Sequence, residues 1–126
     1  MPKRLLIVDD EDDIRTIVTA ALEELAGWHI IEADTVQTGL DLAVRAQPDA
    51  ILLDISMPDR DGFNLFAQLQ DQPATQAIPV IVFTSKVLAQ DRSRFATLAI
   101  AGVITKPFDP LRLGNQIASL LAWEIP

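Results

Sequence analysis

The chain has 126 residues, of which 49% are hydrophobic, and it contains no cysteine. This length is typical of one domain, the apolar content argues against disorder, and the lack of cysteine excludes disulfides, thiolate metal ligands and cysteine nucleophiles. The formal net charge of −8 is the wrong sign for contacts with a phosphate backbone, so we expect no direct binding to nucleic acid.

The sequence shows no apolar stretch of the length that a membrane span or a signal peptide requires. The run Leu5–Val8 after Lys3 and Arg4 ends at two aspartates, and the run Ile78–Phe83 is also short. We therefore expect an unprocessed cytoplasmic protein that does not insert into membranes.

Short apolar runs alternate with helical patterns along the chain. Arg4–Val8 predicts a buried strand, and Glu11–Ala26 predicts a helix that ends at Gly27. Apolar residues at spacings of three and four form one face of this helix: Ile14, Ile17, Val18, Ala21, Leu22 and Leu25.

The next strand and helix repeat this arrangement. Trp28–Ala33 predicts a second strand, and Asp34 or Thr35 can cap the helix that follows. The apolar face of this second helix comprises Val36, Leu40, Ala43 and Val44. Ala50–Leu53 is entirely apolar, which predicts a third strand that is buried on both faces.

The second half of the chain continues the alternation. It predicts a loop at 56–62, a helix at 63–69, a loop at 71–79, a strand at 80–83, a weak helix at 90–99, a strand at 102–105 and a helix at 110–123. Five repeats of strand and helix favour a doubly wound α/β domain, in which helices cover both faces of a parallel sheet.

Polar side chains follow the predicted strands at their carboxyl ends. Asp9 and Asp10 follow the first strand, Asp54 the third, Thr84 the fourth and Lys106 the fifth. Each residue alone has an ordinary explanation as a helix cap, a turn residue or a surface lysine. Ligands of doubly wound sheets bind outside the carboxyl ends of the strands, so the joint placement favours a functional site.

The residue types at these positions suit phosphoryl transfer. Carboxylates held close together need a cation to stay ionised, and an all-oxygen donor set suits Mg²⁺. With its charge neutralised, a carboxylate can attack phosphorus and form an acyl phosphate. Lys106 can contact the phosphoryl oxygens as a point charge, and the Thr84 hydroxyl can hydrogen-bond them.

Four motifs resemble those of the response-regulator receiver family of two-component signalling. They are Leu6–Glu11, Asp54–Gly62, Val80–Ser85 and Lys106–Phe108, and they follow the family's order over nearly the whole chain. The resemblance implies a (βα)5 flavodoxin-like fold of three α/β/α layers, with a parallel five-stranded sheet in the order 2-1-3-4-5. We expect one receiver domain over residues 1–126 and no output domain in this chain.

The resemblance also implies a role for each site residue. Asp54 corresponds to the phospho-acceptor, and Thr84 and Lys106 correspond to the switch hydroxyl and the lysine that assist it. The implied ligands of Mg²⁺ are Asp10 and Asp54 directly, Asp9 mostly through water, and the backbone carbonyl of Ser56. The peptide bond between Lys106 and Pro107 is expected to be cis, as is common in the family.

The resemblance further implies a signalling protein that catalyses only its own phosphorylation and dephosphorylation. A sensor histidine kinase or a histidine phosphotransfer protein would supply the phosphoryl group, and an unidentified downstream protein would bind the switched surface. We expect a monomer or a weak, phosphorylation-dependent dimer.

This chain departs from the family where the switch signal leaves the site. The family often has tyrosine or phenylalanine at the position of Val103, and valine is too small and stiff to replace a mobile ring. We therefore expect the signal to pass through residues 84–95. Ser56 and Lys86 occupy positions that tune the phosphoryl lifetime in the family.

Three other functions compete with this interpretation. A Mg²⁺-dependent phosphohydrolase typically needs a second acid two residues after the nucleophile, where this chain has Ser56. A receiver-like module that never takes phosphate usually lacks one of the acids, the threonine or the lysine, and all are present here. A nucleotide-binding flavodoxin-like protein needs a phosphate-binding loop after the first strand, where the acidic run Asp9–Asp13 would repel phosphate.

Overall fold

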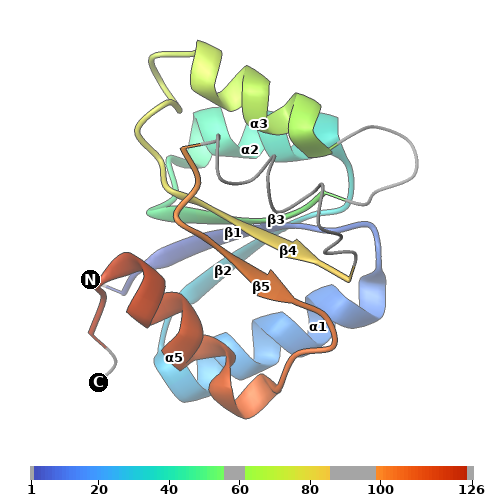
Figure 1. The fold of residues 1–126 in the computed structure, drawn as a ribbon, viewed down its shortest axis with the longest axis vertical. Helices are drawn as coiled ribbons and strands as arrows, with labels where there is room; N and C mark the ends of the chain where they lie inside the picture. Colours follow the sequence, from blue (N-terminus) through green and yellow to red (C-terminus); the bar gives the residue numbers. More distant parts are fainter. Residues whose placement is uncertain (1, 56–61, 86–98, 125–126) are drawn as a thin grey trace.

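The computed structural model describes residues 2–55, 62–85 and 99–124 (Figure 1). Its elements are β1 (Arg4–Val8), α1 (Asp12–Ala21), the π-helical turn η1 (Leu22–Ala26), β2 (His29–Ala33), α2 (Val36–Ala46), β3 (Ala50–Asp54), α3 (Gly62–Asp71), β4 (Val80–Thr84), β5 (Gly102–Thr105) and α5 (Pro110–Leu121). The helix predicted at 90–99 falls almost entirely outside the described residues, as does most of the loop predicted at 56–62.

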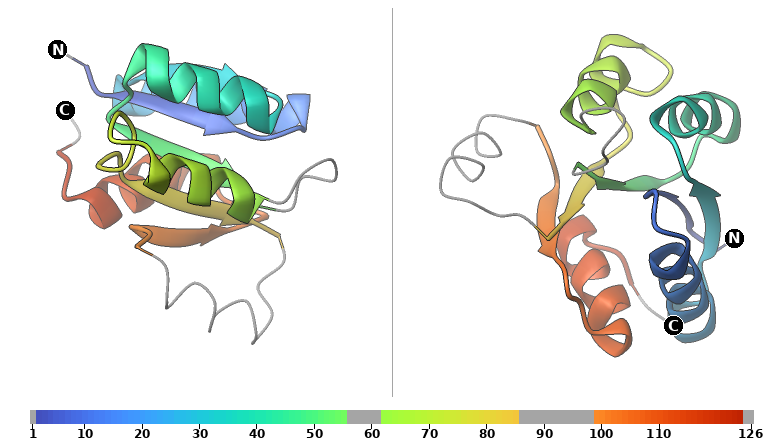
Figure 2. Two further views of the ribbon diagram at one scale, coloured as in Figure 1. Left: turned by 90° about the horizontal axis from the view of Figure 1, so that it is seen from above. Right: turned by 90° about the vertical axis from the view of Figure 1, so that its right-hand side faces the viewer.

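The strands form one parallel sheet in the order β2-β1-β3-β4-β5, which confirms the predicted topology. Helices α1 and α5 cover one face of the sheet, and α2 and α3 cover the other (Figures 1 and 2). The sheet is therefore the middle layer of an α/β/α sandwich, in which each crossover returns the chain to a parallel strand.

The core lies in two layers because side chains alternate along each strand. Leu5 and Ile7 of β1 point into the layer beneath α1 and α5, whereas Leu6 and Val8 point into the layer beneath α2 and α3. Every residue of β3 and β4 is buried, and for β3 this confirms the burial that the apolar run Ala50–Leu53 predicts.

Helix α2 begins at its cap and packs close to β1. The Thr35 hydroxyl accepts a hydrogen bond from the Thr38 backbone N–H at 3.1 Å, so Thr35 rather than Asp34 is the N-cap. A Cβ added at Gly39 would lie 2.9 Å from a Val8 methyl group. The absence of a side chain at Gly39 therefore allows α2 to approach the strand that carries Asp9 at its end.

The exposed fractions of three side chains correct the predicted helix faces. Ile17 is 43% exposed and Val44 is 38% exposed, because each lies at the edge of its helix's apolar stripe. Leu25 is 54% exposed, whereas the next residue, Ala26, is 2% exposed. The turn that contains Leu25 is a π-turn, which holds an extra residue and changes the side that each following residue faces.

No helix in the described parts of the chain is long and apolar enough to cross a membrane.

Candidate functional site

Asp9 and Asp54 extend from neighbouring strands at the carboxyl edge of the sheet. Val8 of β1 pairs with Leu53 of β3, so the two residues that follow this pair emerge side by side. Asp9 is 0% exposed and Asp54 is 1% exposed. Two carboxylates therefore meet in the interior, where each ionised group requires a partner of opposite charge.

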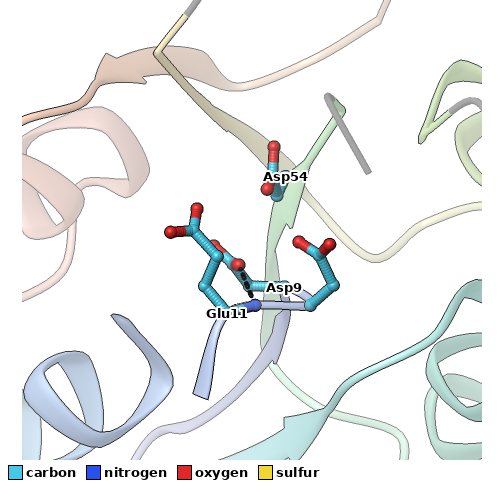
Figure 3. Close-up of side chains that lie close together, drawn as sticks. Asp9, Glu11 and Asp54 are labelled. Carbon is cyan, nitrogen blue, oxygen red and sulfur yellow. Dashed lines mark hydrogen bonds between the residues drawn. The ribbon is translucent and has the colours of Figure 1, made fainter. Parts of the chain in front are cut away.

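Two more acids complete a cluster at this edge. Oxygen atoms of Asp9, Asp10, Glu11 and Asp54 all lie within 4.8 Å of one another, and Asp10 and Glu11 are exposed. The Asp9 and Glu11 side chains extend from the β1–α1 turn toward the end of β3 (Figure 3). The Glu11 backbone N–H also donates to Asp9 Oδ1 at 2.9 Å. Glu11 is absent from the predicted site residues, although it belongs to the same acidic run.

Lys106 places its ammonium group among these acids. Its Nζ lies 2.7 Å from Asp9 Oδ2, 3.3 Å from Asp54 Oδ2 and 3.3 Å from Glu11 Oε1. The Lys106–Pro107 bond is cis, as the resemblance predicts. The single charge of Lys106 thus contacts three of the four clustered carboxylates.

Two aromatic rings lie beside this lysine, and neither is among the site residues that the sequence predicts. The Lys106 Nζ lies 4.9 Å from the ring centroid of Phe83, and the Phe83 ring packs against Phe108 at 5.1 Å. Phe83 belongs to β4 and Phe108 follows the cis proline. Their positions in two of the family-like motifs are the only sequence signal that could have indicated this role.

Burial and pairing have opposing effects on the ionisation of Asp9 and Lys106. Burial raises the pKa of the Asp9 carboxyl above its ordinary value of 3.8, and the hydrogen bond from Lys106 only partly offsets this effect. Burial lowers the pKa of the Lys106 ammonium, but the hydrogen bonds and charges of Asp9 and Asp54 outweigh this and raise it overall. Lys106 therefore remains a cation at neutral pH.

Thr84 is fully buried at the end of β4, the strand beside β3. Its backbone carbonyl accepts a hydrogen bond from the Lys106 N–H at 2.9 Å, so the threonine and the lysine are tied together through the backbone. The fold thus brings Lys106 into contact with Asp9 and Asp54, places Asp10 in the same acidic cluster and places Thr84 on the adjoining strand end. Ser56 and Lys86 lie outside the described residues.

The route predicted for the switch signal lies mostly outside the described residues as well, since it covers 84–95. Val103 is half-buried on β5 and lines a hollow between β5 and α5 together with Ile104 and Leu120. None of the described residues that line this hollow is aromatic.

Comparison with known proteins assigns the chain to a family. Residues 5–118 match the response regulator receiver domain. The chain belongs to the response regulator receiver family. The match covers most of the chain, from β1 into α5, and includes every strand end that carries a site residue. This domain is therefore a receiver module of two-component phosphorelay signalling, which confirms the resemblance seen in the sequence.

Two curated relatives show how this receiver compares with longer regulators. The phosphate regulon transcriptional regulatory protein PhoB of Pseudomonas aeruginosa is 35% identical over 119 residues, which are 94% of this chain and 52% of that protein. The response regulator PleD of Caulobacter vibrioides is 33% identical over 126 residues, which are 99% of this chain and 27% of that protein. The chain thus spans about half of the first relative and about a quarter of the second.

Solved receivers have the same fold over nearly their whole length. The chemotaxis protein CheY4 of Vibrio cholerae has a TM-score of 0.87 and 25% identity, covering 95% of this chain and 99% of that chain. A CheY-like receiver domain protein of Methanospirillum hungatei has a TM-score of 0.86 and 25% identity, covering 97% of this chain and 95% of that chain.

Proposed function

We propose that residues 1–126 act as one receiver unit that accepts a single phosphoryl group on Asp54 in the presence of Mg²⁺. The main support is the position of Asp54, which is buried at the end of the central strand with its carboxylate 3.3 Å from the Lys106 ammonium and beside three other acids. A nucleophilic carboxylate needs such neutralising and orienting partners, because phosphoryl transfer depends mostly on positioning and charge stabilisation.

The donor set fits Mg²⁺, because the available ligands are hard carboxylate oxygens at one open edge of the sheet. Asp10 and Asp54 would bind the ion directly, Asp9 would bind it mostly through water, and the Ser56 carbonyl would complete the protein's share. When bound, the ion supplies positive charge that neutralises the acids and the phosphoryl oxygens. The Lys106 side chain supplies a second positive charge beside the same acids.

In the proposed reaction, an Asp54 carboxylate oxygen forms a bond to the phosphorus of a phosphohistidine. The bond between phosphorus and the imidazole nitrogen breaks, and its electron pair leaves with the nitrogen, which takes up a proton from solvent. Lys106 contacts the transferred phosphoryl oxygens, and the Thr84 hydroxyl donates a hydrogen bond to one of them. Attack of water on the phosphorus later releases inorganic phosphate and restores the Asp54 carboxylate.

This chemistry defines the classes of partner that we propose. A sensor histidine kinase or a histidine phosphotransfer protein supplies the phosphoryl group, and a downstream protein binds the surface that changes on phosphorylation. The domain acts catalytically only on its own aspartate, in its phosphorylation and its dephosphorylation.

Labelling of the purified domain tests this proposal. Acetyl phosphate with Mg²⁺ should add one phosphoryl group to the wild-type domain, detectable by intact-protein mass spectrometry, and Asp54→Asn should abolish the addition. Asp34→Asn is the matched control, because Asp34 is an exposed acid that follows a neighbouring strand but lies outside the cluster. Labelling of Asp54→Asn at the wild-type level would refute the assignment. Catalytic turnover of a generic phosphate ester would instead favour a phosphohydrolase.

A further inference from the structure

Arg15 of α1 reaches back to the turn that carries the clustered acids. Its side chain is 12% exposed, and its guanidinium contacts three oxygen groups. One nitrogen donates to the backbone carbonyl of Asp9 at 2.6 Å, and a second donates to the carboxylate of Asp12. The third, Nε, lies 3.3 Å from Glu32 Oε1 at the end of β2. The proposed phosphoryl transfer assigns no role to this arginine.

With the contact from Arg15, every polar group of Asp9 has a hydrogen-bond partner. Its backbone N–H donates to Ala33 of β2 at 3.0 Å, and its carboxylate accepts from the Glu11 N–H and from Lys106. Arg15 holds the remaining polar group, the Asp9 carbonyl. Because the peptide unit is planar, fixing this carbonyl also fixes the direction in which the chain enters Asp10.

We propose that Arg15 is a positioning residue for the divalent-cation site. By holding the peptide between Asp9 and Asp10, it keeps the Asp10 carboxylate next to Asp54, where both can bind one ion. The planar fork of a guanidinium suits this task, since it bonds several acceptors in one fixed geometry. This inference rests on the proposed function, because it concerns the metal that phosphorylation requires.

A positive charge this close to a cation site also has an electrostatic effect of the opposite sign. Taken as a charge alone, Arg15 repels a divalent cation, so its removal would tighten cation binding. Asp12 and Glu32 contact the same guanidinium and offset that repulsion, although both are substantially exposed. Positioning and charge therefore predict opposite changes in affinity when Arg15 is removed.

Titration of the metal-free domain with MgCl₂, without any phosphodonor, distinguishes the two effects. The dissociation constant for Mg²⁺ is measured by isothermal titration calorimetry. Arg15→Ala should raise it about tenfold, the lower end of the effect of residues that orient metal ligands. Arg15→Lys keeps the charge but loses the fork, so it should raise the constant by less, about threefold.

Arg112→Ala is the matched control. Arg112 also lies three residues after an aspartate at the start of a helix, the N-cap Asp109 of α5, and its side chain is 81% exposed. Its removal changes the net charge by the same amount and should leave the dissociation constant within about twofold of wild type, because exposed charges are well screened.

The other outcomes overturn the inference in distinct ways. If Arg15→Ala binds Mg²⁺ with unchanged affinity but melts at a lower temperature, Arg15 stabilises only the start of the helix. If Arg15→Ala binds Mg²⁺ more tightly, Arg15 acts on the site only as a repelling charge. If Arg15→Ala does not fold, the test rests on Arg15→Lys. A dissociation constant for Mg²⁺ equal to that of wild type in Arg15→Lys would refute the inference that the guanidinium positions the site. Failure of the wild-type domain to bind Mg²⁺ would remove the proposed function together with this inference.

Discussion

Asp9 carries its carboxylate in the interior of the domain, and its surroundings only partly compensate for the loss of water. Burial is the largest influence on this group, and the pKa is raised although Lys106 and the Glu11 N–H both contact the carboxylate. An acid with this environment contributes less stability when it is ionised than when it is protonated. The ionised form of Asp9 therefore adds no stability to the metal-free fold, which fits a role in the chemistry of the site.

The stability of the metal-free domain should show this effect. The pKa of Asp9 is raised in the folded state, so its contribution to stability is fully present below the unfolded value of 3.8 and is lost as the pH rises through the folded value. Asp9→Asn should therefore melt higher than wild type at pH 7 in a chelator, and this difference should shrink at pH 4. Each kcal/mol of stability corresponds to roughly 3–5 °C in a domain of this size.

Thermal unfolding followed by circular dichroism checks this expectation. Asp34→Asn, at an exposed position, serves as the control and should give a small difference that is similar at both pH values. A lower melting temperature for Asp9→Asn than for wild type at pH 7 would mean that the ion pair with Lys106 outweighs the cost of burial.

At the scale of the elements, the π-turn at the end of α1 decides which residues reach the core. An α-helix turns about 100° per residue, so an uninterrupted helix would place Leu25 between Ala21 and Val18, which are both buried. The N–H of Gly27 instead bonds to the Leu22 carbonyl, which closes a wider turn. Ala26 takes the buried position, and Gly27 ends the segment with a left-handed φ of 72°.

Two leucine substitutions distinguish the π-turn from a regular helix. Leu25→Gln should change the free energy of unfolding by no more than about 0.5 kcal/mol, because this side chain is largely in solvent. Leu22→Ala should cost about 2–5 kcal/mol, because Leu22 is 1% exposed and its loss leaves a cavity. Urea denaturation of both variants measures the difference. A comparable loss of stability in Leu25→Gln would indicate that the α-helical phase continues through residue 25.

At the scale of the whole molecule, the two ends of the sheet have different tasks. At the carboxyl ends of the strands, acids surround one lysine. At the amino ends of the strands, aromatic side chains pack against one another. There, Trp28 stacks edge-on against Trp123 at 5.2 Å, and the Lys3 ammonium lies 5.1 Å from the Trp123 ring. These contacts join the start of β2 to the end of α5. The site can therefore hold unfavourable charge while distant packing keeps the sheet and helices together.

Mg²⁺ should stabilise the whole fold, because an ion that binds only the folded state shifts the folding equilibrium toward that state. At ten times its dissociation constant, a ligand that binds only the folded state adds about 1.4 kcal/mol, or roughly 4–7 °C in melting temperature. Asp10→Ala should abolish this shift and should melt higher than wild type without metal, because it removes repulsion within the cluster.

The matched control is Asp34→Ala, which should keep the full Mg²⁺ shift, and differential scanning calorimetry records all the transitions. A wild-type melting temperature that millimolar Mg²⁺ leaves unchanged, with Asp10→Ala melting higher in both conditions, would indicate repulsion without a metal site.

The sequence by itself determined the parallel sheet, its helical layers and the edge at which Asp9, Asp10, Asp54, Thr84 and Lys106 gather. These features depend on local patterns, because an apolar run predicts a buried strand and the residue after it lies at the strand's end. The family-like motifs added the strand order and the cis bond before Pro107, and the structure confirms both.

Only the tertiary structure decided which side chains meet at that edge. The contact between Lys106 and Glu11 joins positions 95 residues apart, and the packing of Phe108 on Phe83 likewise depends on how two strand ends align. In the sequence, Arg15 has the pattern of an ordinary exposed helix residue. Its contact with Glu32 depends on the position of β2 beside α1 in the fold. The same holds for the exposure of Leu25, because a π-turn leaves no mark in the apolar spacing. Such contacts depend on distances between remote segments, which the folded backbone sets and no local pattern encodes.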